Sequence, residues 1–543
     1  STVTADEDLK VAAAGDVVVN AAAESAAARS ESKRSRAGLL GLSGGTFEFY
    51  SKTTTKDAAQ SVGNAGSVLS AGHDLTLDAG RDATIIGSAV AAGHDASLSA
   101  GRDVNLLPGQ EYGFRSHSEK RESIGIGASF SASGLGLFAG HRATEQGLEH
   151  QGDYTAGSLV SAGNDVAVKA GRDVNQVGSH IDAGRDVALD AGRDWNMTAS
   201  YDTESLHQYI KQTQVGISAS AGSKAWDAVR ATGRLPEELT AGRGGAGYSA
   251  LTAAGAGLQY VDAVNSGLSE LLSASVSAGA SSSRTDYRGA TSTAQPSGVY
   301  AGRDVQAEAG RDIIIEGGRV VAERDVILDA GRDLTISAAL NTGSSSTTSS
   351  SAGADVGLKG SIGASGVGGG VNMSAYASGS TSSGRSDTRV DAVIAAGDTL
   401  SSSSGRDTTV AGAHLEGDSV WMDVGRDLTV ASLQDHTEHE SSSWSAGGSV
   451  TVGAGVSGSV GVSGGSSHMS SGWVNTQTSI LGQKKTILHV GDTTRLEGGL
   501  IASATGNLLI DTGSLMFTAL QASKMTVRPM KVLLRGELIA CLW

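Results

Sequence analysis

Cysteine, proline and aromatic residues are scarce in this sequence. Its 543 residues include 1 Cys, 4 Pro and 4% aromatics. The lone Cys541 excludes a disulfide within the chain, so the fold is held without covalent cross-links. A compact core of this length would ordinarily contain more Phe, Tyr and Trp. The composition therefore favours small side chains packed in thin, repeated layers.

Positive charge and long apolar runs are also lacking. The formal net charge is −16, which argues against nucleic acid as a partner because nucleic-acid binders present a basic face. The basic cluster of Arg29, Lys33, Arg34 and Arg36 is interpreted as a solvated turn. No apolar run reaches the roughly 18 residues of a transmembrane helix. No secretion signal is visible at the N-terminus, so an exported protein would carry one upstream.

Glycine, by contrast, is abundant. The 77 glycines are about twice the usual share, and they follow no Gly-X-Y period, which excludes collagen. Their positions relate instead to a recurring "AGRD" tetrapeptide, seen twice in "AGRDVALDAGRD" (183–194).

Aspartates recur with a fixed period. Three clusters share spacings of 8, 13 and 8 residues, and a looser fourth cluster follows at Asp398, Asp407, Asp418 and Asp427. The regular clusters are Asp74, Asp82, Asp95, Asp103; Asp165, Asp173, Asp186, Asp194; and Asp304, Asp312, Asp325, Asp333. The spacing predicts a repeat of about 21 residues with two corners in each period.

Apolar and polar residues alternate after each Asp, as in a short strand with one buried face, with Gln176 as an exception. We expect glycine to supply a corner with positive φ and aspartate to hydrogen-bond the backbone just beyond it. The predicted corner residues are Gly72, Asp74, Gly80, Asp82, Gly163, Asp165, Gly171, Asp173, Gly184, Asp186, Gly192, Asp194, Gly302, Asp304, Gly310, Asp312, Asp325, Gly331 and Asp333.

Short strands, glycine corners and a 21-residue period predict an all-β fold, a right-handed parallel β-helix. The alternative is calcium binding at the corners, but calcium-binding repeats need Gly-Gly-x-Gly and a nine-residue period. The residue before Asp is usually Arg or His, which would repel a cation. No metal or other cofactor is therefore expected, and added calcium should leave the melting temperature unchanged.

Gly/Ser-rich segments with alternating apolar residues interrupt the repeats, as in "SIGIGASFSASGLGLFAG" (123–140) and "SVTVGAGVSGSVGVSGG" (449–465). The favoured interpretation is a β-hairpin that packs on the stalk. The alternative is a strand that enters a membrane, since about 9–11 alternating residues suffice. The residues that would contact the membrane are Ile124, Ile126, Phe130, Val450, Val452 and Val456.

Catalytic and metal motifs are weak. Ser43 and Ser463 fit G-x-S-x-G, but neither lies between a buried strand and a helix, so no enzyme is predicted. His436 and His439 could share one side of a turn, yet no Cys completes a zinc site. His73, which replaces the usual Arg of the tetrapeptide as His94 also does, is interpreted as a solvent-facing alternate.

The paired "AGRDVxLxAGRD" units with Ser/Gly-rich inserts resemble the haemagglutinin repeats of filamentous-haemagglutinin-type exoproteins, over roughly residues 1–515. These are bacterial proteins secreted by the two-partner route, and they include contact-dependent growth-inhibition effectors. The inserts resemble the more distal repeat region of such proteins, in which the stretch 224–275 resembles a helical insert. No "VENN" motif is present, and the pattern is lost from about Met516.

The resemblance implies a secreted protein at the bacterial cell surface, associated with the outer membrane. Its partners would be an outer-membrane two-partner-secretion transporter and the surface of a host or neighbouring cell. The first hypothesis is an elongated adhesive stalk. The alternative is a toxin-delivery region that acts at the outer membrane of a target cell.

The predicted organisation alternates coils and inserts. Coils are expected at 1–110 (with a polar insert at 24–64), 158–200, 299–340, 391–433 and 479–515; Gly/Ser-rich inserts at 111–157, 341–390 and 434–478; an insert with the helical segment at 201–298; and an atypical tail at 516–543.

Overall fold

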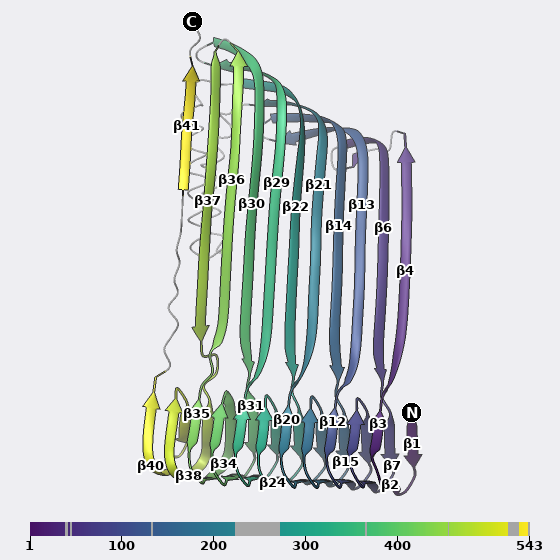
Figure 1. Cartoon of the computed structure of the whole chain (residues 1–543), viewed down its shortest axis with the longest axis vertical. Coiled ribbons are helices and arrows are strands. Elements are labelled where there is room, and N and C mark those ends of the chain that lie inside the picture. Colours follow the sequence, from purple (N-terminus) through teal and green to yellow (C-terminus); the bar gives the residue numbers. More distant parts are fainter. Residues whose placement is uncertain are drawn as a thin grey trace.

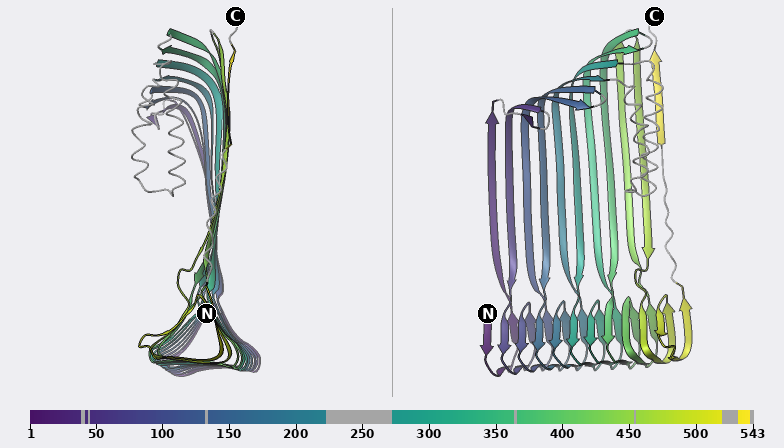
Figure 2. Two further views of the ribbon diagram at one scale, coloured as in Figure 1. Left: turned by 90° about the vertical axis from the view of Figure 1, so that its left-hand side faces the viewer. Right: turned by 180° about the vertical axis from the view of Figure 1, so that it is seen from behind.

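A computed structural model shows an all-β protein with two regions, a parallel β-helix and a long antiparallel sheet that rises from it (Figures 1 and 2). It describes residues 1–38, 42–43, 46–131, 134–222, 272–363, 366–453, 455–519 and 532–540, with side chains undescribed at 42–43, 46–47, 127–131, 134–136, 220–222, 272–273, 361–363, 366–367 and 532–540. No helix in these parts of the chain has the length and hydrophobicity needed to cross a membrane.

The β-helix is a stack of eleven coils, each with three sides, whose strands pair in parallel with the coils before and after. Its strands are β1 (Thr2–Ala5), β2 (Leu9–Ala13), β3 (Val17–Asn20), β7 (Val68–Ala71), β8 (Leu75–Ala79), β9 (Ala83–Ile86), β10 (Ala89–Ala92), β11 (Ala96–Ala100), β12 (Val104–Leu107), β15 (Leu159–Ala162), β16 (Val166–Ala170), β17 (Val174–Val177), β18 (His180–Ala183), β19 (Val187–Ala191), β20 (Trp195–Thr198), β23 (Gly298–Ala301), β24 (Asp304–Ala309), β25 (Ile313–Glu316), β26 (Arg319–Ala322), β27 (Asp325–Ala330), β28 (Leu334–Ser337), β31 (Ala392–Ala396), β32 (Thr399–Ser404), β33 (Thr408–Ala411), β34 (Ala413–Val424), β35 (Leu428–Ala431), β38 (Ser479–Glu497), β39 (Leu500–Ser503) and β40 (Leu508–Thr518).

The inward side chains form one continuous core along the stack. Every second residue of a coil strand is buried, as in β8, where Leu75 and Leu77 are 0% exposed. Because each such side chain lies above its equivalent in the next coil, Leu77 pairs in register with Leu98 and so on along the axis. Small aliphatic side chains fill this narrow interior, which explains how the chain folds with so few aromatics.

Each coil has three corners, not the predicted two. The third corner follows β9, β17, β25 and β33, and it contains the positive-φ glycines Gly87, Gly178, Gly317 and Gly412. A column of buried serines marks the same corner, where the Ser158 backbone N–H donates to Ser179 Oγ at 3.0 Å. No Asp recurs with the coil period at this corner in the described chain, so the aspartate spacing did not reveal it.

The glycines of the first two corners do not have positive φ, so the predicted reason for them is wrong. Close contact between coils favours them instead, although Glu323 takes the equivalent position in one coil. A Cβ added at Gly184 would lie less than 3.0 Å from the carbonyl of Gly163 in the coil before, and Gly192 meets Gly171 in the same way. The same clash recurs at Gly72, Gly80, Gly163, Gly171, Gly302, Gly310 and Gly331.

Long hairpins leave the β-helix at the third corner and pair with one another in a 12-stranded antiparallel sheet, which we call the hairpin sheet. Its strands are β4 (Ala22–Ala37), β5 (Leu42–Ser43), β6 (Thr46–Ala65), β13 (Gly109–Ser131), β14 (Gly134–Ala156), β21 (Ser200–Gly222), β22 (Leu272–Gln295), β29 (Ala339–Gly363), β30 (Gly366–Val390), β36 (Asp435–Gly453), β37 (Val456–Trp473) and β41 (Val532–Ala540).

A hairpin follows every second coil, and this spacing explains why the sheet is continuous. Coils stack at about 4.8 Å, the same distance that separates paired strands. A two-stranded hairpin is therefore as wide as two coils are high. Neighbouring hairpins consequently meet at hydrogen-bonding distance, and β14 pairs with β21 from Gly134–Gly222 to Asp153–Thr203.

The structure bears on two predictions about the inserts. The hairpins do not pack on the stalk, because their edges are used to pair with each other and the sheet stands away from the coils (Figure 2). The predicted helical segment 224–275 lies outside the described residues up to 271, and 272–275 belong to strand β22.

Aromatic side chains cover glycines in the hairpin sheet. Tyr209 lies directly opposite Gly147, and a Cβ added at Gly147 would meet the Tyr209 ring. Trp444 covers Gly379 in the same manner. These pairs restore side-chain packing where glycine supplies none, a known way to stabilise glycine-containing sheets.

Candidate functional site

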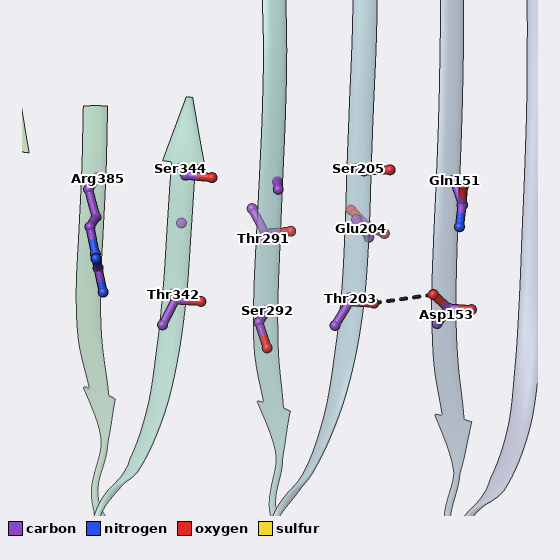
Figure 3. Close-up of a pocket in the computed structure, with 12 residues that line it drawn as sticks. Gln151, Asp153, Thr203, Glu204, Ser205, Thr291, Ser292, Thr342, Ser344 and Arg385 are labelled. Carbon is purple, nitrogen blue, oxygen red and sulfur yellow. Dashed lines mark hydrogen bonds between the residues drawn. The ribbon is translucent and has the colours of Figure 1, made fainter. Parts of the chain in front are cut away.

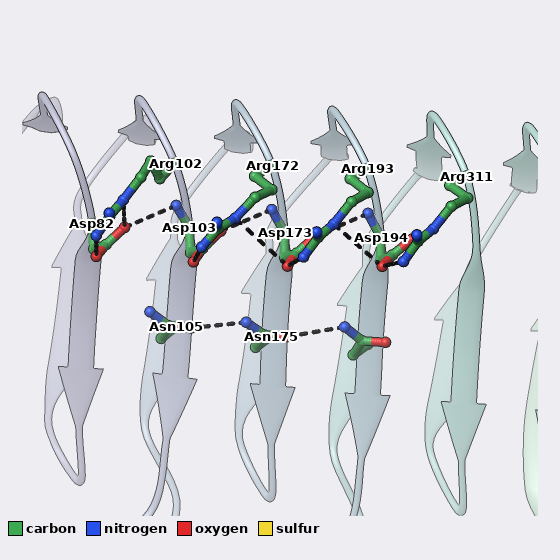
Figure 4. Close-up of polar contacts among 11 residues, drawn as sticks. Asp82, Arg102, Asp103, Asn105, Arg172, Asp173, Asn175, Arg193, Asp194 and Arg311 are labelled. Atoms are coloured by element: carbon green, nitrogen blue, oxygen red, sulfur yellow. Dashed lines mark hydrogen bonds and ion pairs between the residues drawn. The ribbon is translucent and has the colours of Figure 1, made fainter.

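Asp and Arg form a column along the second corner of the coils (Figure 4). Arg193 Nε donates to Asp173 Oδ1 at 2.7 Å, and its Nη2 donates to Asp173 Oδ2. Each guanidinium of the column thus makes a bidentate pair with the carboxylate of the coil before. The same Asp173 Oδ1 accepts the backbone N–H of Asp194 at 3.3 Å. The aspartate contacts are therefore between coils, and the predicted local bond to the backbone just beyond is wrong.

The charges in this column stabilise contacts between coils. The hydrogen bond from Arg102 lowers the pKa of Asp82, and that from Arg172 lowers the pKa of Asp103. Both carboxylates stay charged, and each is matched by a guanidinium. The corner aspartates hold coils together.

The first corner has the same arrangement in the fifth to seventh coils, at Arg185, Arg303 and Arg324. Arg303 Nε donates to Asp186 Oδ1 at 2.7 Å. Earlier in the chain, His73 and His94 occupy the Arg position, and their rings stack with centroids 4.7 Å apart. A hydrogen bond with Asp8 raises the pKa of His73. These histidines therefore join the column, and they are more than solvent-facing alternates.

One face of the hairpin sheet carries a continuous aliphatic surface far from the β-helix. Residues paired directly across antiparallel strands share a face, and the register Ile126–Ala139–Ile217–Ala278–Val356–Met373–Val450 defines one row of it. We call the exposed members of this row and its two neighbours the apolar band: Ile124, Ile126, Leu137, Val215, Ile217, Val276, Val356, Leu358, Val371, Met373, Val450, Val452 and Val460.

The apolar band is exposed to solvent although it is aliphatic. Val356 is 47% exposed and Leu358 66%. Most of the intervening residues, which face the other side, are small or polar: Gly216, Ser218, Ser277, Gly279, Asp355, Gly357, Asn372, Ser374, Ser449, Thr451 and Ser459. Phe138 of β14, which pairs with Ser218, is an aromatic exception on that face. A single-layer sheet with one apolar and one polar face is suited to contact with an apolar partner on one side only.

Charged and aromatic side chains border the apolar band on the side nearer the β-helix. Lys120, Lys211, Arg284 and Trp444 belong to one register row with Glu145, two rows below the band and on its face. Tyr209 belongs to the next row with Asp286, which pairs with Arg284. Polarity therefore rises along the strands from the distal band to two rows of charged and aromatic side chains.

A shallow polar groove of about 520 Å³ lies on the same face, close to the β-helix (Figure 3). Its floor contains hydroxyl groups from β21, β22 and β29, including Thr203, Ser292 and Thr342, which are directly paired. Asp153 accepts a hydrogen bond from Thr203 at 3.4 Å, and Arg385 lies at the far side.

The structure brings together most of the residues predicted to contact a membrane. Ile124, Ile126, Val450 and Val452 belong to the apolar band, although β13 and β36 are far apart in sequence. Val456 pairs with Val452 and so shares its face. The side chain of Phe130 lies outside the described residues.

The other predicted clusters are separated or unsupported. His436 and His439 are three residues apart on strand β36, so their side chains lie on opposite faces and cannot share one side of a turn. Ser463 lies within strand β37, away from any helix of the described chain.

Comparison with known proteins agrees with this architecture. The Hemagglutinin repeat family matches residues 49–153, 139–244, 276–446 and 435–526, which together cover most of the chain. The chain belongs to the Hemagglutinin repeat family. Proteins with these repeats are two-partner-secretion exoproteins, and this chain is accordingly a filamentous-haemagglutinin-like secreted protein exposed at the cell surface.

A curated relative shares the repeats at greater length. Deoxyribonuclease CdiA of Dickeya dadantii (strain 3937) is 29% identical over 429 residues, which is 75% of this chain and 13% of CdiA. This chain therefore spans a small part of the length of that Hemagglutinin repeat protein.

Sequence reasoning missed the apolar band as one surface. It identified alternating segments singly, whereas the band arises because a hairpin follows every second coil and brings the segments into register. The available signal was the grouping of aspartates in fours, since two pairs of corners mean two coils between inserts.

Proposed function

We propose that this chain is the target-contacting part of a secreted delivery effector, in which the β-helix is the stalk and the apolar band rests on the outer membrane of a neighbouring cell. The apolar band carries this proposal. The proposal is also consistent with the name of the relative to which the matched region is similar, deoxyribonuclease CdiA.

The polarity of the sheet favours lipid as the contacted surface. Aliphatic side chains lie distally, and Lys120, Lys211, Arg284 and Trp444 follow in one row toward the β-helix. Cations and Trp are the side chains that anchor proteins at the boundary between lipid tails and water. Because the opposite face carries Ser, Gly and Asn, contact is made by one face, with the other face left in water.

Flotation with liposomes of outer-membrane lipid tests this proposal. The variant Ile126→Asp/Val356→Asp/Val452→Asp places three charges in the apolar band, where a charge in contact with lipid is destabilising. We expect at least a tenfold loss of the floated fraction. The matched control Ser277→Asp/Ser449→Asp/Ser459→Asp adds the same charge to the opposite face and should float like the unmodified protein.

Two results would contradict the membrane role. One is that the unmodified protein does not associate with these liposomes, and the other is that both triple variants float equally. Urea midpoints of the three proteins establish that any loss of flotation is not a loss of folding.

Adhesion is a second candidate function, which the polar groove of Figure 3 favours. Hydroxyls from three paired strands, the Asp153 carboxylate and the Arg385 guanidinium offer the hydrogen-bonding groups that a cell-surface oligosaccharide needs. Arg385→Ala should then weaken binding to a glycan array and leave liposome flotation unchanged; unaltered glycan binding would exclude this groove as the site.

We further infer that export uses an outer-membrane transporter of the two-partner type, as for other Hemagglutinin repeat proteins. Neither candidate function assigns a catalytic step to this chain. Secretion of the chain fused to a two-partner export domain, in strains with and without such a transporter, tests the inference; equal secretion in both strains would refute it.

A further inference from the structure

The column of residues at the first corner changes chemistry along the β-helix. In the fifth, sixth and seventh coils this position is Arg185, Arg303 and Arg324, and each guanidinium pairs with the aspartate of the coil before. In the first four coils the equivalent residues are Glu7, His73, His94 and Asn164, and in the eighth and ninth they are Asp398 and Asp418. The second corner differs, since Arg occupies it from Arg81 in the second coil to Arg426 in the ninth.

This substitution leaves carboxylates without a fixed counter-charge. The ion pairs of Asp8, Asp74 and Asp95 in the described chain are all with imidazoles, and none is with a guanidinium or an ammonium group. Asp6 and Glu7 add further negative charge to the same corner. The first corner therefore gathers several carboxylates around two imidazole rings.

We propose that His73, Asp74 and His94 bind a zinc ion. Asp74 Oδ1 lies 3.3 Å from His73 Nδ1 and 3.0 Å from His94 Nδ1, and one ligand atom from each of the three residues lies within 4.8 Å of the others. Neighbouring ligands of tetrahedral zinc are roughly 3.3 Å apart, given bonds of about 2.0–2.1 Å. The ion takes the place of the protons that these contacts now share.

The surroundings permit this coordination. The side chains of His73 and His94 are 52% and 47% exposed, so the rings can rotate to close on the ion and water can fill a fourth position. Imidazole and carboxylate are both common zinc ligands, and the carboxylates of Asp8 and Asp95 lie next to the same nitrogens. The ion links the second coil to the third, as an Arg does in later coils.

Equilibrium dialysis of the full chain against zinc chloride near neutral pH tests the site. The informative variant is His73→Arg/His94→Arg, which gives these coils the Arg that later coils already contain and is therefore expected to fold. We expect the unmodified protein to retain one more zinc ion per chain than this variant. Hydrogen exchange should also slow in β7, β8, β10 and β11 on zinc addition, in the unmodified protein only.

His117→Arg is the matched control. His117 is exposed and contacts the carboxylate of Asp57 at 2.6 Å, but no second imidazole stacks on it. This variant should bind zinc as the unmodified protein does. The proposal is overturned if the unmodified protein and His73→Arg/His94→Arg bind equal zinc, or if His117→Arg loses as much bound ion as the double variant. Calcium chloride in place of zinc should give no difference between the proteins, because calcium prefers oxygen ligands.

Discussion

In both the β-helix and the hairpin sheet the backbone N–H and C=O groups are hydrogen-bonded between neighbouring strands. The two regions differ in how far their side chains are buried. Each coil of the β-helix closes around an interior in which Leu77 and Val326 are 0% exposed. The hairpin sheet is a single layer, so Val356 and Ile217 remain about half exposed on one face. A layer with no second layer against it buries no core. Coil spacing and backbone pairing therefore maintain this sheet without a core. Its two faces remain available for contact.

The first prediction removes the coil spacing that the sheet needs. Deletion of 158–178 takes out one coil and joins two equivalent corners, because Leu159 pairs with His180. Hairpins two strands wide would then be only one coil apart. We expect β14 and β21 to lose their pairing and their hydrogen-exchange protection, while the core of the β-helix stays protected.

A longer deletion sharpens this test. Removal of 158–296 takes out two coils with their hairpin, and Gly298 then follows in the register of Leu159 and His180. The remaining hairpins are again two coils apart, so β14 should pair with β29. If the longer deletion disrupts the sheet as much as the shorter one, coil spacing is not what builds it.

The second prediction contrasts glycines of the two regions. Gly184→Val places a side chain against the carbonyl of Gly163 in the adjacent coil, and backbone cannot move aside easily. We expect a loss of about 2–4 kcal/mol in the free energy of unfolding. Gly461, in the hairpin sheet, has nothing within 4 Å of an added Cβ, so Gly461→Val should be tolerated. Urea unfolding of both variants measures the contrast; equal losses would show that inter-coil contact does not require glycine.

The third prediction concerns the Asp/Arg columns. Asp186→Ala removes the acceptor of Arg303 and of the Asp304 backbone N–H, which lies 3.3 Å away. We expect a loss of ~0.5–2 kcal/mol, typical of a charge-assisted hydrogen bond between partly exposed groups. Asp190→Ala breaks only an exposed pair with Lys169 and should have no measurable effect on the urea midpoint. A midpoint for Asp186→Ala equal to that of Asp190→Ala would rule out a stabilising column.

The fourth and smallest effect is the pH dependence of one such pair. The hydrogen bond from Arg172 holds the pKa of Asp103 below its usual value of 3.8. Its stabilisation is therefore complete above the unfolded-state pKa and is lost as the pH falls through the folded-state pKa. Asp103→Asn should accordingly be less stable than the unmodified protein near neutral pH. The difference in the free energy of unfolding between the two proteins should become smaller below about pH 4. A constant difference at every pH would mean that the charge contributes nothing.

The aspartate period predicted the coil, and particular residues explain where prediction stopped. Asp165 and Asp186 are 21 residues apart and lie in register, as expected. The third corner escaped detection because buried serine and glycine mark it, and these residues are common throughout the chain. Gly184 was predicted correctly as a corner residue but for a wrong reason, since a clash between coils 21 residues apart leaves no local trace.

The other features that the sequence did not reveal depend on contacts between segments that are distant in the chain. The apolar alternation of β13 and β36 was visible, but its common face depends on register through β14, β21, β22, β29 and β30. The stacking of His73 on His94 likewise requires the coil geometry, although their 21-residue separation already matched the period.

The attachment of the hairpins has a mechanical consequence. The first four hairpins are joined to the β-helix by only one or two residues at each end, as between β12 and β13 or between β14 and β15. An arm with the 23 residues of β13 reaches about 75 Å from this junction. Bending one arm alone would break its hydrogen bonds to both neighbours, so the arms deflect together as a plate. A force on the distal edge of the sheet is thus distributed over all these junctions. It acts on the β-helix as a torque about its long axis.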